Sequence, residues 1–488
     1  MSSFKVVARS RLYAAWTVVF RIWESDNTRA LSSYRSVARR VLFPVLDTLR
    51  GTHAARCLNE IEESQWWPYE RIVEMQSQRL QYLIQYAYER VPYYRRAMDE
   101  RGISPGAIRG VEDISLLPVL TKSDVREHMD ELVASGFAPR ELLPGRTSGS
   151  TGTPLAFYSS KQGRWSYGLA RSLRALGAAG VFPGDRTVCV TGSGGFVRPA
   201  PLNRLTRAFS RKTLLDPARF SDETLPEVVE DIRRLRPQAL LGYASAICII
   251  AAYIRDSGTR FPQVGAVVTG GEELFPAQRA LIRDVFGCGP FSKYSSFENY
   301  DIAMECSAHS GLHVAAEDLI VEVVDAEGRP VEPGFTGRVI VTNLREFGMP
   351  LIRYDTADES SLVSEVCECG RGLPRLSAVV GRVGEVIYTP SGKRLSTVSL
   401  DSSILVSLGV TQFQLVQERI DHVTVSVVPG GSLSPADGEA TTVAVRRHFE
   451  SWLGDSMQVD VVAVQRIAPT DSGKHRYQIS RVTPSPWG

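Results

Sequence analysis

The stretch Thr147–Pro154, with the sequence TSGSTGTP, places two pairs of hydroxyl side chains and two glycines within eight residues. Glycine lets neighbouring backbone N–H groups converge on one point, and serine and threonine hydroxyls donate further hydrogen bonds to phosphate oxygens. The stretch therefore predicts a phosphate-binding loop, with a flexible Ser/Gly linker as the alternative. The residues expected to hold phosphate are Thr147, Ser148, Gly149, Ser150, Thr151 and Gly152.

Two common nucleotide-binding patterns do not fit this stretch. The P-loop pattern GxxxxGK[ST] requires a lysine that is missing here, and the pattern GxGxxG of dinucleotide-binding folds does not match it either. The loop is therefore expected to belong to another class of phosphate-binding protein.

Downstream of the loop, short β-rich segments alternate with amphipathic helical segments. Strands are expected at 187–191, 239–241 and 264–269, and helices at 165–176, 225–235 and 277–285. This alternation favours βαβ units and a largely parallel sheet, so an α/β core is expected.

Four regions are expected along the chain. Near the N-terminus glycines are few, and apolar residues recur at three- and four-residue spacing, as in 71–87. This pattern indicates helices. The turns AEGRP and PGFTG indicate connected strands further on, and the last part contains strands and one helix. The expected regions are a helical N-terminal region at 1–110, an α/β core at 111–318, a β-rich subdomain at 319–380 and a small α+β domain at 381–488.

The composition excludes several classes of protein. Among 488 residues, 56 Lys and Arg nearly balance 54 Asp and Glu, which argues against a nucleic-acid partner. The apolar run 12–20 is too short to cross a bilayer and lacks a signal-peptide cleavage site, so a packed helix at 4–23 is preferred over one on a membrane. Seven sparse cysteines fit a reducing cytoplasm, and a homodimer is left open.

The order of several motifs, from roughly residue 60 onward, resembles the adenylate-forming superfamily, and within it the phenylacetate–CoA ligase-like and CapK-like branch. Besides Thr147–Pro154, the motifs are GGEEL at 270–274, YSSFE at 294–298, RYDTAD at 353–358, GRVGE at 381–385 and TDSGKHR at 470–476. The resemblance implies an α/β adenylate-forming fold, with a large N-terminal domain and a small C-terminal domain that swings about a hinge near Gly384 and Glu385. The chain departs from the family where Thr153 replaces a lysine, and within YSSFE.

The resemblance also implies roles for individual residues. Glu298 would help to bind Mg²⁺, Tyr294 would stack on adenine, and Asp358 would hold the ribose hydroxyls. Lys474 would be the catalytic lysine of the first half-reaction. Further ATP contacts would come from the adenine-binding turn and from the GRVGE motif, through Gly271, Glu272, Glu273 and Arg382.

The implied activity is attack of a carboxylate on the α-phosphorus of ATP, which releases pyrophosphate and forms an acyl adenylate. Lys474 and Mg²⁺ would offset the repulsion between the two anions. A thiol or amine would then take the acyl group, with CoA as the preferred acceptor and a carrier-protein thiol or an amine, glycan or natural product as the alternative. The missing loop lysine and altered hinge keep open a different class, a non-catalytic nucleotide-binding partner of biosynthetic enzymes.

The acyl pocket of the family points to residues at the strand ends. An aromatic wall there would suit an aryl or medium-sized apolar carboxylate, although aromatic residues at strand ends also serve as core packing. The candidate pocket residues are Phe196, Tyr243, Ser295 and Phe297.

A second group of residues suits a metal. Thiolates and imidazoles suit tetrahedral zinc, and the candidate ligands are three cysteines and one histidine. Some phenylacetate–CoA ligase-like proteins carry these cysteines, and the resemblance therefore implies a structural zinc site. His309 competes with His313 for the imidazole position, and the alternative is a set of reduced cysteines beside unrelated histidines. The preferred ligands are Cys306, His313, Cys367 and Cys369.

Overall fold

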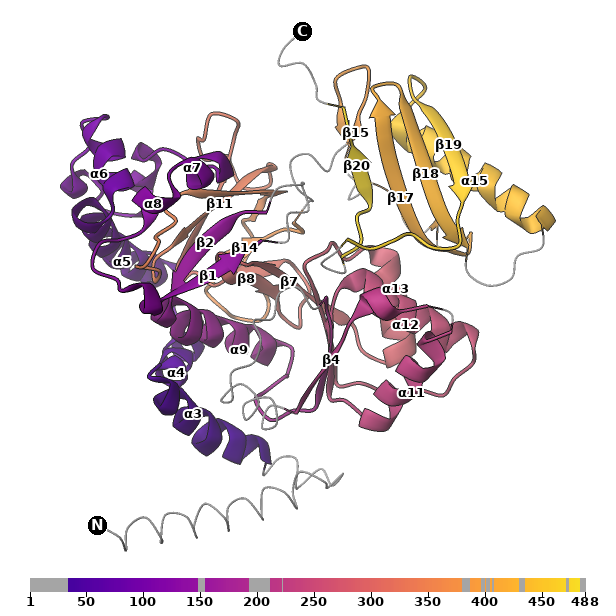
Figure 1. Ribbon diagram of the computed structural model, residues 1–488, viewed down its shortest axis with the longest axis horizontal. Coiled ribbons are helices and arrows are strands. Elements are labelled where there is room, and N and C mark those ends of the chain that lie inside the picture. The colour runs from indigo at the N-terminus through magenta and orange to yellow at the C-terminus, as the bar shows by residue number, and fades with distance from the viewer. Residues whose placement is uncertain are drawn as a thin grey trace, which may run out of the picture.

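The computed structural model shows a large N-terminal part and a smaller C-terminal domain that sits against one end of it (Figure 1). The residues that the structure describes are 34–147, 154–192, 211–221, 223–379, 387–395, 400, 404–405, 408–429, 435–470 and 474–482. Within these ranges, no helix combines the length and the apolar character needed to cross a membrane.

The first described helices form a layer at one side of the large part (Figure 1). The long helix α5 buries Leu80, Leu83, Ile84 and Ala87, whose spacing places them on one face. It ends before Pro92, which disfavours helical geometry in the residue before it. The elements here are a π-helical turn (Ala38–Leu42), α3 (Phe43–Arg50), α4 (Ala54–Ser64), α5 (Tyr69–Arg90), α6 (Pro92–Asp99), α7 (Lys122–Glu127) and α8 (Met129–Leu132), with short 3₁₀ turns at Pro105–Ala107, Val111–Leu116 and Pro139–Glu141.

A nine-stranded sheet forms the centre of the large part, in the order β13-β14-β9-β8-β7-β6-β5-β3-β4. The strands β4, β3, β5, β6 and β7 run parallel, whereas β7, β8, β9, β14 and β13 pair antiparallel. Their bounds are β3 (Thr187–Val190), β4 (Lys212–Leu215), β5 (Ala239–Gly242), β6 (Ala266–Gly270), β7 (Pro290–Ser296), β8 (Tyr300–Glu305), β9 (Leu312–Val314), β13 (Leu362–Val363) and β14 (Arg375–Leu376).

The predicted helices and parallel strands are present, but the expectation of a largely parallel sheet holds for only one side. The alternation of strand and helix stops after α13 (Pro276–Phe286). From β7 onward turns replace the crossover helices, so the following strands reverse direction. Residues 319–380 are likewise divided between two sheets, because β13 and β14 join the large one.

Helices cover both faces of the parallel strands. Leu240 of β5 packs in the core shared with α11 (Leu225–Leu235), α12 (Ala244–Asp256) and α13 (Pro276–Phe286). Its neighbours Ala239 and Leu241 point to the other face, toward the end of α9 (Leu169–Ala178). Both faces are therefore buried, and the strand ends remain as the place for a site.

Two smaller sheets complete the large part. The hairpin of β1 (Leu142–Arg146) and β2 (Ala156–Ser160) flanks the predicted phosphate loop. The end of β2 is held by the buried Glu346, which accepts hydrogen bonds from the backbone N–H groups of Ser160 and Gly348, both at 2.8 Å. The strands β10 (Leu319–Val324), β11 (Gly337–Asn343) and β12 (Tyr354–Ser360) form an antiparallel sheet, as the turn-rich sequence predicts.

The C-terminal domain has the predicted α+β composition. Its sheet has the order β19-β18-β17-β20, and α15 packs on it through Val445 and Phe449. Phe275 of the large part joins the same hydrophobic cluster, so the two parts share buried surface. The elements are β15 (Ile387–Tyr388), β16 (Arg394–Leu395), β17 (Val410–Arg419), β18 (His422–Pro429), α15 (Pro435–Leu453), β19 (Gln458–Ala463) and β20 (Gln478–Ser480).

Candidate active site

The site is built at the carboxyl ends of the neighbouring parallel strands β5 and β6, which is where ligands bind in open α/β sheets. Strand β6 ends in Gly270, and Gly271 adopts a left-handed backbone conformation with φ +77°. A Cβ atom at Gly271 would lie 3.1 Å from the ring of Tyr243 and 3.3 Å from Cε of Lys474. A glycine at this turn therefore lets the Tyr243 ring and the lysine approach the backbone closely.

Lys474 reaches this turn from the C-terminal domain. Its Nζ lies 5.9 Å from the centroid of the Tyr243 ring, within reach of a cation–π attraction. Backbone hydrogen bonds close its loop, since Thr470 N–H donates to Lys474 O at 2.8 Å and Lys474 N–H donates to the Thr470 hydroxyl at 3.2 Å. The sequence-predicted lysine thus lies at the predicted adenine turn.

Glu272 joins three segments at this point. Its carboxylate accepts hydrogen bonds from Ser245 N–H in the first turn of α12, at 2.9 Å, and from His475 N–H, at 2.5 Å. Burial raises the pKa of Glu272, while the hydrogen bonds from Ser245 and His475 and the charge of Lys474 act in the opposite direction. The predicted ATP-binding turn is therefore also a contact between the two domains.

Aromatic and polar contacts extend this domain interface. Tyr477 packs edge-on against Phe275, with ring centroids 4.8 Å apart, and accepts a hydrogen bond from the Gln278 amide at 2.7 Å. Burial raises the pKa of the neighbouring Glu273 to about 8. Together these contacts hold the C-terminal domain against the large part, with Lys474 facing the strand ends.

Tyr294 and Asp358 form a hydrogen-bonded pair from two different sheets. Tyr294 lies on β7, and its hydroxyl donates to Oδ2 of Asp358 on β12 at 2.7 Å. The Tyr294 side chain is buried and belongs to the hydrophobic cluster between the two sheets. The pair fixes the carboxylate that the resemblance assigns to the ribose.

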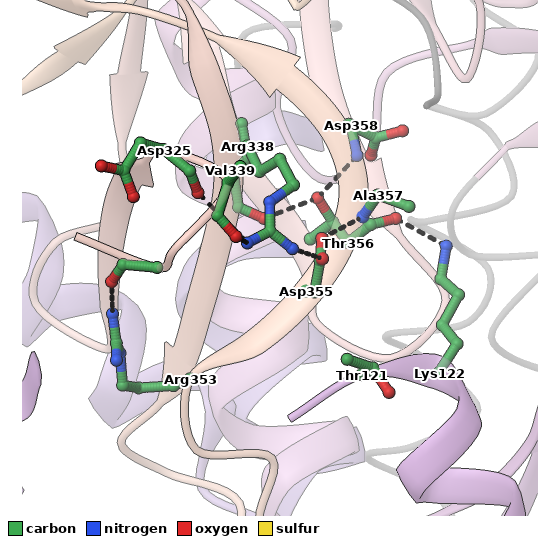
Figure 2. Close-up of polar contacts among 12 residues, drawn as sticks. Thr121, Lys122, Asp325, Arg338, Val339, Arg353, Asp355, Thr356, Ala357 and Asp358 are labelled. Atoms are coloured by element: carbon green, nitrogen blue, oxygen red, sulfur yellow. Dashed lines mark hydrogen bonds and ion pairs between the residues drawn. The ribbon is translucent and has the colours of Figure 1, made fainter. Parts of the chain in front are cut away.

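The backbone before Asp358 is shaped by a set of polar contacts (Figure 2). Thr356 donates its hydroxyl to Val339 O at 2.8 Å, and Lys122 donates to Thr356 O at 2.6 Å. Ala357 has a φ of +62°, and its N–H donates to Asp355 Oδ1 at 2.7 Å. Such a strained conformation in a non-glycine residue needs support from its surroundings, and here it turns the chain immediately before Asp358.

Glu298 lies in the turn between β7 and β8. Its carboxylate is buried and accepts a hydrogen bond from the hydroxyl of the fully buried Tyr354 at 2.8 Å. Ser295 is partly buried near the end of β7, whereas Phe297 is 38% exposed. The protein therefore covers Phe297 only in part.

The predicted metal ligands come together. The ligand atoms of Cys306, His313, Cys367 and Cys369 all lie within 4.8 Å of one another. The Cys306 and Cys367 sulfurs are 3.6 Å apart, and Cys369 Sγ is 3.3 Å from His313 Nε2. Tetrahedral zinc with Zn–S bonds of 2.3 Å would place its sulfurs about 3.8 Å apart, so the group has the right size.

The histidine of this cluster is His313, and His309 is engaged elsewhere. His309 Nδ1 lies 3.0 Å from Glu305 Oε2, outside the cluster. Burial lowers the pKa of His313 to about 4, which keeps its ring neutral as a metal ligand requires. Although burial opposes it, hydrogen bonds from the Ser310 hydroxyl and the Cys369 backbone N–H lower the pKa of the Cys367 thiol to about 7.

Several sequence-predicted residues lie outside the described ranges. Thr147 is described, and its hydroxyl accepts a hydrogen bond from Leu155 N–H at 2.8 Å, which closes the base of the loop. The predicted residues outside are Ser148, Gly149, Ser150, Thr151, Gly152, Phe196 and Arg382, together with the hinge residues Gly384 and Glu385.

Three residues that contact the predicted ones were not predicted from the sequence. Tyr354 holds Glu298, Ser245 holds Glu272, and His475 ties the Lys474 loop to the same carboxylate. Tyr354 lies within the motif RYDTAD and His475 within TDSGKHR, so their positions in these motifs could have marked them as candidates. Their partners, however, lie far away in sequence.

Comparison with known proteins agrees with this architecture. A family model described as the CapK C-terminal domain matches residues 387–481. A phenylacetate–coenzyme A ligase from Thermus thermophilus is 27% identical over 81% of this chain and 86% of its own length. The protein CapK from Staphylococcus aureus is 24% identical over 84% of this chain and 90% of its own length.

A solved structure of 2-hydroxyisobutyryl-CoA ligase in the postadenylation state has a TM-score of 0.70 at 22% identity, over 85% of this chain and 90% of that one. The same enzyme in the thioesterification state has a TM-score of 0.54 at 24% identity, over the same shares. The likeness shows that the fold is that of adenylate-forming ligases. The chain is thus similar over most of its length to phenylacetate–CoA ligases and to CapK, and its C-terminal part matches the CapK C-terminal domain.

Proposed function

We propose that the protein is an acid–CoA ligase, which activates a carboxylate with ATP as an acyl adenylate and then transfers the acyl group to the CoA thiol. The observation that carries the proposal is the position of Lys474, which the C-terminal domain holds against Gly271 at the ends of the parallel strands. Glu298 and Asp358, the carboxylates assigned by resemblance, are each fixed by a tyrosine hydroxyl.

The first half-reaction brings two anions together, since a carboxylate oxygen attacks the α-phosphorus while pyrophosphate leaves. Lys474 supplies a cation at the carboxylate and α-phosphate, where charge accumulates in the transition state. Glu298 offers a hard oxygen ligand of the kind that Mg²⁺ prefers, and Tyr354 holds it in place. Mg²⁺, when bound, would neutralise charge on the phosphate oxygens.

The pairing of Tyr294 with Asp358 suggests how the nucleotide would be positioned. Asp358 can accept hydrogen bonds from both ribose hydroxyls through its oxygens, while Tyr294 keeps the carboxylate in one orientation. The adenine would lie beside the turn that contains Gly271. Pyrophosphate would leave toward the loop between β1 and β2.

The acyl group would lie near Tyr243 and the exposed Phe297, with Ser295 beside them and Phe196 as a further candidate. Aromatic faces favour an aryl or medium-sized apolar carboxylate. The cluster of Cys306, His313, Cys367 and Cys369 would hold one zinc ion with four protein ligands, which leaves no position for a substrate and makes the zinc structural.

A second candidate function follows from the match of residues 387–481 to the CapK C-terminal domain. The C-terminal domain contacts the large part beside the strand ends, so its similarity to the CapK domain bears on the choice of acceptor. The alternative is therefore adenylation followed by ester or amide formation on a carrier protein, glycan or amine.

Product analysis separates these functions. The protein is incubated with ATP, Mg²⁺ and a panel of aryl and aliphatic acids, with CoA or with amine and sugar acceptors, and products are identified by mass spectrometry. We expect AMP, pyrophosphate and an acyl-CoA. AMP release that depends on another acceptor would favour the CapK-like alternative, and ATP binding without any product would overturn both.

Tyr354→Phe is expected to weaken adenylation while leaving the fold intact. The change removes the hydrogen bond to Glu298 and keeps the buried ring, so loss of a hydrogen bond to a charged group should slow adenylation by about tenfold. The apparent affinity for Mg²⁺ should fall in parallel. Tyr88→Phe, which removes the hydrogen bond from another tyrosine hydroxyl to a carboxylate, that of Asp99 at 2.9 Å, is the control. An equal loss in both variants would contradict the role of Tyr354.

A further inference from the structure

The carboxylate of Glu272 spans the boundary between the two domains. One hydrogen bond reaches Ser245 N–H, which belongs to the same domain as Glu272, and the other reaches His475 N–H in the C-terminal domain. The His475 ring is buried and donates through Nε2 to Phe413 O at 2.8 Å, so the residue after Lys474 is fixed at both its backbone and its ring.

The two hydrogen bonds of Glu272 depend differently on the arrangement of the domains. The N–H of Ser245 lies in the first turn of α12, where helix geometry provides no acceptor, so this hydrogen bond persists in any arrangement of the domains. The bond to His475 exists only while the Lys474 loop lies against the turn after β6. When the C-terminal domain turns away, water can solvate that N–H instead.

We propose that Glu272 is a positioning residue that fastens the Lys474 loop in the closed arrangement, so that the first half-reaction depends on it and the second does not. This inference rests on the proposed function. It also differs from the role of an adenine contact, because the carboxylate accepts hydrogen bonds from two backbone N–H groups of the protein itself.

Loss of the Glu272 acceptor has different energetic consequences in the closed and the open arrangement. Without an acceptor, His475 N–H is left unsatisfied at a buried interface in the closed arrangement, which is costly. In the open arrangement water solvates His475 N–H, so removal of the Glu272 acceptor costs no hydrogen bond there. Removal of the acceptor therefore shifts the equilibrium away from the closed state, and Lys474 spends less time beside the strand ends.

Glu272→Gln tests the proposal with little change in shape. Glutamine keeps one acceptor oxygen, but its NH₂ group must face one of the two backbone donors. Arg466→Ala is the matched control, since it removes another contact between the domains, from an exposed side chain to Ala218 O at 3.3 Å.

Two measurements are made on both variants and on the unaltered protein. Hydrogen–deuterium exchange reports the protection of the peptide that carries His475 N–H, whether or not the enzyme is active. Rapid-mixing assays follow the two half-reactions separately, with adenylation started from ATP and acid, and thioester formation started from preformed acyl adenylate and CoA.

For Glu272→Gln we expect lower protection of the His475 peptide and adenylation slowed by about 10- to 100-fold, with thioester formation from acyl adenylate changed less than about twofold. Arg466→Ala should resemble the unaltered protein. Equal loss in both half-reactions, or slowed adenylation with unchanged protection of the His475 peptide, would overturn the positioning role of Glu272 in favour of a structural or an adenine-binding role. If the unaltered protein performs no adenylation, the proposed function fails, and the protection of His475 still decides the positioning role.

Discussion

Lys474→Ala is expected to slow formation of the acyl adenylate by about a hundredfold or more, which corresponds to loss of roughly 2.7–4 kcal/mol of transition-state stabilisation. The lysine is carried to Gly271 by a loop that hydrogen bonds and aromatic packing hold in place. Its Nζ approaches the Tyr243 ring, beside the strand ends where the reacting groups would meet. No other described group in this turn supplies a positive charge.

The effect of Lys474→Ala should be confined to one half-reaction. Thioester formation from preformed acyl adenylate and CoA should proceed at the rate of the unaltered protein, because the lysine acts on phosphate and carboxylate charges that are no longer being brought together. Lys393→Ala, which removes an exposed lysine of the same domain, serves as control. Equal loss of both half-reactions would contradict the role of Lys474.

His313→Ala is expected to release one zinc ion per chain and to lower the melting temperature by about 10 °C. The cluster joins the turn after β8, strand β9 and the loop between β13 and β14. That loop also holds the N-terminal helices, since Arg371 donates to Gln65 Oε1 at 2.8 Å and Gly372 N–H donates to Gln65 O at 3.0 Å. Loss of the metal should therefore loosen the contact with α4 as well.

His309→Asn is the matched control for the zinc prediction. Asparagine tolerates the left-handed conformation of this position, where φ is +49°. The variant should keep its zinc and melt close to the unaltered protein, because His309 contacts Glu305 and not the cluster. Elemental analysis and thermal unfolding measure both variants. Zinc far below one per chain in the unaltered protein, or loss of zinc from His309→Asn, would contradict the assignment.

Local patterns predicted much of the fold. Segments whose periodicity is set by neighbours in sequence, such as α5, α11 and the strands β5 and β6, form where expected. The antiparallel side of the large sheet was not predicted, because short strands such as β9 and β14 pair across some sixty residues and carry little periodicity of their own. A strand of only two residues, such as β14, cannot be distinguished from a turn by sequence alone.

The candidate site was predicted in its chemical groups but not in its supports. Lys474, Glu298 and Asp358 stand out because charged residues in motifs suggest chemistry, and the metal ligands stand out because cysteine and histidine suit zinc. Their partners Tyr354, Ser245 and His475 are common residues whose importance arises from contacts across the fold. Glu272, predicted as an ATP contact, also bonds to the Lys474 loop through His475 N–H, a contact that its motif alone does not indicate.

Exchange of labelled pyrophosphate into ATP, measured across aryl and aliphatic acids, tests the proposed adenylation most directly, because it requires no acceptor and no knowledge of the second half-reaction. The arrangement of Lys474, Glu298 and Asp358 predicts exchange that depends on the acid and is strongest for one class of acid. ATP binding without exchange for any acid, or hydrolysis of ATP to ADP and phosphate, would contradict it.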